Sequence, residues 1–180
     1  MKKFIAVLLT VLLLYGCGNM NTPTAKVKAF LNNYNNLSDD VVADLETKVE
    51  AENLSDENKN VYKDVLKKQY KDMKYEVKDE NIDGDKATVK VKVTVYDLYK
   101  IDKDTVNYMN NNAGEFMDEN GIYSENMFNK YRLGEMLKTN NTVNYEIEFY
   151  LNKINDEWVV ESPDRITLEK IHGLYNYDQE

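Results

Sequence analysis

Two stretches of alternating apolar and polar residues constrain the fold of this 180-residue chain more than any other feature. In residues 88–95 valine occupies every second position, and residues 143–152 alternate in the same way. Successive side chains of a β-strand point to opposite faces of a sheet, so each run predicts a strand with one buried and one solvated face. We therefore expect an antiparallel sheet that is covered on one side.

Turn signals next to these runs predict two hairpins. Asp83-Gly84 lies between the first run and an alternation at Tyr75 and Val77, and a turn near Asn155-Asp156 separates the second run from Trp158. Aspartate or asparagine beside glycine is typical of a tight hairpin turn. The first two strands and the last two should therefore each form an antiparallel pair.

Apolar residues at helical spacing occupy most of the remaining chain, and they follow N-cap residues. Thr22, Ser38 and Ser55 each precede such a run, which predicts three helices before the first hairpin. Residues 103–138 predict a helical insertion between the hairpins, including one stripe over 106–117, and a short helix follows Asp164. The predicted fold class is α+β, in one domain over residues 22–180.

The start of the chain has the pattern of an export signal. Lys2 and Lys3 precede an apolar run at residues 4–14, which is shorter than the ~20 residues of a membrane-spanning helix. The run ends in Leu-Tyr-Gly-Cys, and Cys17 is the chain's single cysteine. This ending resembles the lipobox of bacterial lipoproteins.

The lipobox resemblance implies a lipid anchor. In that family the cysteine thiol carries a diacylglycerol and the signal is cleaved just before it, here between Gly16 and Cys17. Residues 1–16 would be the signal peptide and 17–21 a lipidated tether, and the protein would lie on the extracytoplasmic face of the cell membrane. Two acyl chains give stable anchoring. The alternative is an ordinary signal peptide with an incidental cysteine.

The order of the predicted elements resembles that of small NTF2-like bacterial lipoproteins of unknown function. The similar motifs are the opening Thr22-Pro23 with V-x-x-F-L, the W-V-V-E-S-P stretch at 158–163, and the short Leu/Ile helix at 164–173. The resemblance implies helices on the concave side of a curved antiparallel sheet (NTF2-like or cystatin-like), enclosing a pocket. The insertion at 103–138 is longer than that family's usual connection, so another α+β layer fold is the alternative.

Several kinds of chemistry are disfavoured by the residues present. The net charge of −9 disfavours nucleic-acid binding. His172 is the single histidine, so an ordinary zinc site cannot form. We expect this residue at the surface or in a helix cap. Residues 79–85 have part of a calcium-loop pattern, but Lys90 stands where its last carboxylate belongs, so a hairpin turn is predicted. We predict no catalytic residue, metal or cofactor.

A pair of glutamates on one strand has a structural explanation. Glu146 and Glu148 lie two positions apart, on the polar face of their strand. If Lys90 and Lys92 occupy the neighbouring strand, the four form exposed cross-strand ion pairs worth ~0.2–1 kcal/mol each. Exposed carboxylates do not acquire the raised pKa of an acid catalyst.

A possible pocket mouth lies between the first valine-rich strand and the insertion. The candidate lining residues are aromatic or methionine: Tyr96, Tyr99, Tyr108, Met109, Phe116 and Met117. Core packing between helix and sheet is the alternative interpretation. The sequence thus favours a non-enzymatic binding or interaction domain, whose partner is an envelope protein or a small apolar ligand. Two alternatives are an envelope hydrolase or lyase that uses carboxylates, and an assembly partner with an exposed apolar patch.

Overall fold

The computed structural model describes residues 21–179, so the predicted signal peptide and the Gly16–Cys17 cleavage site lie outside the described residues. The fold is α+β, as predicted. In chain order its elements are α1 (Pro23–Asn35), α2 (Asp39–Glu50), α3 (Asp56–Asp72), β1 (Lys74–Asp83), β2 (Lys86–Tyr96), α4 (Leu98–Asn111), the 3-10 helix η1 (Ala113–Phe116), α5 (Glu125–Lys138), β3 (Thr142–Ile154), β4 (Glu157–Val160), α6 (Arg165–His172) and the 3-10 helix η2 (Tyr177–Gln179).

The helices α1, α3, α5 and α6 begin directly after a capping side chain, whereas the insertion predicted from residue 103 begins earlier, at Leu98. The side chains of Thr22, Ser55, Ser124 and Asp164 each accept a hydrogen bond, of 2.7 to 3.4 Å, from the backbone N–H three residues later. Each bond satisfies one of the N–H groups that the first turn of a helix leaves unpaired. Ser38 precedes α2 but makes no such bond.

Both predicted hairpins form, within one antiparallel sheet of order β1-β2-β3-β4. The turns require left-handed backbone, with φ of +59° at Gly84 and of +51° and +65° at Asn155 and Asp156. The register of β2 and β3 places Lys90 opposite Glu148 and Lys92 opposite Glu146.

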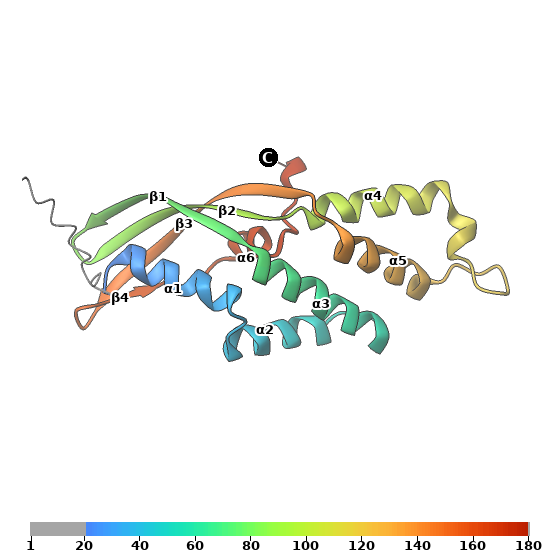
Figure 1. The fold of residues 1–180 in the computed structure, drawn as a ribbon, viewed down its shortest axis with the longest axis horizontal. Coiled ribbons are helices and arrows are strands. Elements are labelled where there is room, and N and C mark those ends of the chain that lie inside the picture. Colours follow the sequence, from blue (N-terminus) through green and yellow to red (C-terminus); the bar gives the residue numbers. More distant parts are fainter. Residues whose placement is uncertain (1–20, 180) are drawn as a thin grey trace, which may run out of the picture.

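The cross-strand charges form part of the open face of the sheet. The Lys90 ammonium lies 3.0 Å from the Glu148 carboxylate, which confirms the predicted pairing for that pair. The valines that alternate with Lys90 and Lys92 are buried on the opposite face, where α1, α3 and α6 cover the sheet (Figure 1). One covered and one solvated face is the arrangement that the alternation predicted.

The molecule is elongated, with the strand turns at one end and the α4–α5 arm at the other (Figure 1). The helical insertion is present, but the prediction of a single stripe over 106–117 is wrong. The helix α4 ends at Asn111, and η1 is a separate turn. Side-chain amides of Asn111 and Asn112 donate to the carbonyls of Asn107 and Tyr108 at 2.9 Å. Asparagines that bond to backbone groups favour helix ends.

Candidate ligand-binding cleft between two helices

A hollow of about 660 Å³ lies between α2 and α6. Its lining comes from helices alone, with α1 and α3 contributing one tyrosine each. Ligand pockets commonly have volumes of ~300–1,000 Å³ and apolar walls with a few polar groups. We call this hollow the α2–α6 cleft; its lining residues are Tyr34, Val41, Asp44, Leu45, Thr47, Lys48, Tyr70, Arg165, Leu168, Glu169 and His172.

The spacing of apolar residues along α2 and α6 determines which side chains form the walls of the cleft. Val41 and Leu45 lie four residues apart on α2, and Leu168 and His172 lie four apart on α6. Residues at this spacing share one face of a helix. Each helix therefore presents two side chains, one turn apart, to the same space.

Aromatic rings form the floor of the cleft and continue into the core. Tyr70 lies 5.1 Å from Tyr34 and 5.8 Å from His172, measured between ring centroids. Phe30 lies 5.5 Å from Tyr34 and 5.6 Å from Phe149 on β3. Such distances are typical of favourable aromatic pairs. The floor is thereby joined to the covered face of the sheet.

His172 is buried, with 9% of its surface exposed, so the expectation of a surface position is wrong. It is the last residue of α6, and Tyr70 covers its ring. Burial, together with the positive charge of Lys48, lowers the pKa of the imidazole to about 4. The ring is therefore neutral at pH 7, with one nitrogen able to donate and the other able to accept a hydrogen bond.

The tyrosines of the floor also stay protonated at pH 7. Burial raises the pKa of both Tyr34 and Tyr70, and the charge of Asp44 adds to the shift of Tyr34. The charged lining residues Asp44, Lys48, Arg165 and Glu169 are exposed or half-buried, and Arg165 contacts Glu169 at 2.5 Å. The cleft thus offers an apolar body, neutral hydrogen-bonding groups at its floor and charges of both signs at its entrance.

A close backbone contact holds α6 against the sheet. Gly173, with φ of +71°, has no side chain, and a Cβ there would lie 2.1 Å from the Tyr96 carbonyl oxygen. The buried Gln69 side chain accepts from the Tyr96 N–H at 2.9 Å and donates to its carbonyl at 3.2 Å. Gly173 in turn accepts from the Tyr99 N–H at 2.8 Å. This joint fixes the position of His172.

The six residues predicted to line a pocket mouth lie at separate places. Tyr108 and Phe116 pack together in the arm with ring centroids 6.3 Å apart, Met109 is half-buried, and Met117 is 39% exposed. Tyr99 packs on Tyr177 near the C-terminus, with ring centroids 5.0 Å apart.

Tyr96 stands apart from the other five. The ammonium of Lys68 lies 3.2 Å from its ring centroid, and its hydroxyl donates to Asp72. None of the six lines the α2–α6 cleft. No local pattern in the sequence indicates that α2 and α6 leave a hollow between them.

The described residues offer little to acid–base or metal chemistry. Wherever the pKa of a carboxyl group is clearly shifted in residues 21–179, it is lowered, by a lysine partner or by backbone N–H groups. In the same part of the chain no group of three or more His, Cys, Asp or Glu residues could hold a metal ion. Nor is any helix there long and apolar enough to cross a membrane.

Comparison with protein-family models, with curated proteins and with solved structures gives no match for this chain. The assignment of the α2–α6 cleft as a candidate site therefore rests on its geometry alone.

Proposed function

We propose that this protein is a lipid-anchored envelope lipoprotein whose domain binds a small amphiphile in the α2–α6 cleft without chemical turnover. The observation that carries the proposal is the cleft itself, about 660 Å³ of mostly apolar lining above neutral His172 and Tyr70. A ligand with an apolar body and a polar head would place its body against Val41, Leu45 and Leu168. Its head would reach the charges at the rim.

The lowered carboxyl pKa values favour binding over the alternative, a hydrolase or lyase that uses carboxylates. A general acid needs a pKa raised toward neutrality, usually by burial. In the cleft, Asp44 is exposed and Glu169 is paired with Arg165. The buried imidazole has a lowered pKa, which makes it a weak base at pH 7.

The proposed anchor would orient the domain on the membrane. The side chain of Asn21 donates to the Asp156 carbonyl at 2.7 Å and accepts from the Trp158 N–H at 2.9 Å, so the chain enters the domain beside the β3–β4 turn. Four residues span at most ~14 Å. A lipidated Cys17 would therefore hold the strand turns near the lipid surface and point the α4–α5 arm away from it.

We also propose an NTF2-like arrangement for the fold. Helices on one face of an antiparallel meander, followed by a short closing helix, support that assignment. The four-stranded sheet and the cleft built from helices alone differ from the cone-and-pocket arrangement that the resemblance implies.

Filling the cleft tests the proposed binding. The full-length chain is extracted from bacterial membranes, and native mass spectrometry looks for a co-purified small molecule. Leu168→Trp should abolish the adduct, whereas Ile122→Trp, at a position 64% exposed in the arm, should retain it. An adduct that survives Leu168→Trp, or its absence from wild type, would contradict the proposal. Release of a chemically altered product would favour the enzyme alternative.

Labelling with a palmitate analogue tests the anchor separately. Wild-type cells should incorporate the label into this protein, and Cys17→Ala should abolish it. Equal labelling of the two would leave an exported protein without a lipid anchor.

A further inference from the structure

A second site lies on the opposite side of α6, at an open edge of the sheet. One edge of β3 pairs with β2 along residues 142–152, but the other edge pairs with β4 only over Leu151–Ile154. The last backbone bond across that edge runs from the Glu161 N–H to the Tyr150 carbonyl, at 2.8 Å. Pro163 follows, and proline cannot donate to a sheet. The chain then turns away into α6.

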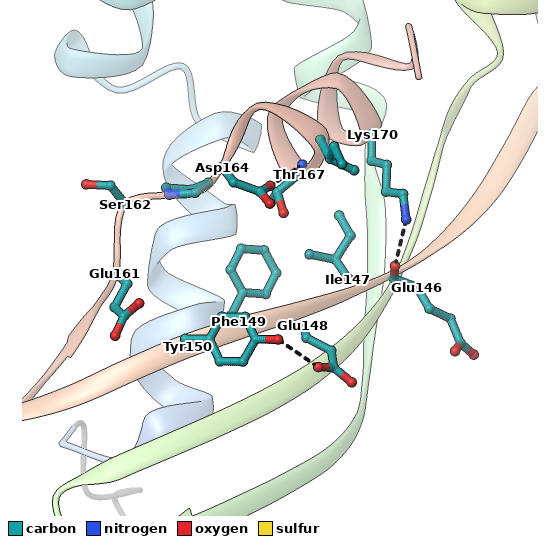
Figure 2. Close-up of a pocket in the computed structure, with 12 residues that line it drawn as sticks. Glu146, Ile147, Glu148, Phe149, Tyr150, Glu161, Ser162, Asp164, Thr167 and Lys170 are labelled. Carbon is teal, nitrogen blue, oxygen red and sulfur yellow. Dashed lines mark hydrogen bonds between the residues drawn. The ribbon is translucent and has the colours of Figure 1, made fainter. Parts of the chain in front are cut away.

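This departure leaves a groove of about 390 Å³ between β3 and residues 161–170. Figure 2 shows Ile147 and Phe149 directed toward α6, while Asp164, Thr167 and Lys170 border the far side. Five residues of β3, 146–150, run along the groove, a length of ~13 Å. A strand edge presents N–H and C=O groups to any extended chain beside it.

One side chain, that of Lys170, makes a weak hydrogen bond to the open edge of β3. The Lys170 ammonium donates to the Glu146 carbonyl at 3.5 Å, the upper limit for a hydrogen bond (Figure 2). The same ammonium lies 4.9 Å from the Tyr175 ring centroid. An incoming backbone N–H would replace the long contact with Glu146, and Lys170 would keep its aromatic neighbour.

The negative charge around the groove favours a basic partner. Four carboxylates line it, from Glu146, Glu148, Glu161 and Asp164, whereas Lys170 is the one basic residue of the lining and Lys90 pairs with Glu148 on the open face. Two copies paired through this edge would bring Glu146 and Glu148 close to their own counterparts, and like charges across a strand pair are destabilising. A basic segment would be attracted instead.

We propose that the β3 edge groove binds an extended segment of a partner protein in which basic and apolar residues alternate. The segment adds as a strand to residues 146–149, because the carbonyl of Tyr150 is already bonded to Glu161. Its basic side chains lie on the open face beside Glu146 and Glu148, and its apolar side chains point toward Ile166, which is 43% exposed in the groove. Main-chain bonds would supply affinity, and the alternating side chains would supply specificity.

The outer edge of β1 is a poorer acceptor for a strand. Its register with β2 is interrupted by an irregularity between Val77 and Asp79. Glu76 and Lys78 near it form an ion pair at 2.5 Å, so both charge signs are present. Bulges and mixed charges are features that protect sheet edges from further pairing. This edge provides a matched control.

The test measures binding of a capped, fluorescent Lys-Val-Lys-Val-Lys-Val peptide to the full-length chain by anisotropy. Glu146→Lys with Glu148→Lys should weaken binding at least tenfold, whereas Glu76→Lys with Asp79→Lys, an equal change of charge on β1, should change it less than twofold. Unchanged unfolding midpoints in urea establish that both variants fold. No binding to wild type, or equal losses in the two variants, would overturn the proposal.

Strand addition is separated from simple charge attraction by methylating the peptide backbone. Two further peptides carry N-methyl groups on every second amide, one at the lysines and one at the valines. At least one of them should bind at least tenfold more weakly, because one set of amides faces β3. Equal binding of all three peptides, or dimerisation of the chain through this edge without peptide, would overturn the proposal.

Discussion

The molecule contains two aromatic clusters whose surroundings differ. The floor cluster, Phe30, Tyr34, Tyr70 and His172, joins α1, α3 and α6 and continues to Phe149 on the sheet. The arm cluster, Tyr108, Phe116, Phe128 and Tyr131, joins neighbouring parts of the chain, α4, η1 and α5. The first lies under a hollow and within the core, whereas the second closes the end of a helical hairpin. Similar residues at helical spacing therefore line a hollow in one place and provide local packing in the other.

The largest expected effect concerns the joint that ties the floor cluster to the sheet. Gly173→Ala should lower the free energy of unfolding by about 4 kcal/mol or more, because a Cβ would lie 2.1 Å from the Tyr96 carbonyl oxygen and 2.2 Å from the Gln69 amide nitrogen. Gly121→Ala is the control: φ there is +74° but the space is open, so a loss of ~1 kcal/mol is expected. Urea unfolding followed by circular dichroism measures both, and equal losses would contradict the close contact.

Removing a ring from the floor cluster should be nearly as damaging. Tyr70 is 2% exposed and contacts both Tyr34 and His172. Tyr70→Ala should cost about 3–5 kcal/mol of unfolding free energy, as for other large aromatic truncations in cores. A loss below ~1 kcal/mol in the same urea experiment would mean that the floor is not part of the core.

Acid should weaken the floor cluster through His172. The folded pKa of about 4 lies below the ordinary 6.5, so between these values the unfolded chain binds more protons and stability falls as pH decreases from 6.5 to 4. Wild type should lose about 2–3 kcal/mol of unfolding free energy on this account between pH 7 and pH 4.5. His172→Phe should lack this component, which the difference between the two pH profiles isolates. Parallel profiles would show that the imidazole is not buried in solution.

The sequence predicted the parts of this molecule that depend on local pattern. Thr22 and Ser55 mark helix starts, Gly84 marks a turn, and the alternation in β2 and β3 determines which side chains are buried. The ion pair of Lys90 with Glu148 was expected on the condition that their strands are neighbours, and the register of β2 and β3 meets that condition. These features depend on neighbours within a few residues or on one strand partner.

The candidate cleft could not be predicted in the same way. Its walls come from α2 and α6, and its floor from Tyr34, Tyr70 and His172, which only tertiary packing brings together. The pocket was predicted beside the arm because Tyr108, Phe116 and the other candidate residues are close in sequence. A histidine followed by a glycine at a helix end is also typical of an exposed helix terminus. His172 is buried because Gly173 lies directly against the Tyr96 backbone, a contact that the local sequence does not reveal.

The smallest expected effect lies in the arm cluster and separates the two clusters most directly. Phe116 is 4% exposed, as buried as many core residues, and it contacts Tyr131 and Phe128. Because these contacts join adjacent elements at one end of the molecule, the loss is limited by the free energy of opening the arm tip alone. Phe116→Ala should lower the global unfolding free energy by only ~1 kcal/mol. Hydrogen exchange should quicken in residues 108–131 and stay unchanged in α3 and β2. Faster exchange throughout would show that the arm and the sheet unfold as one unit.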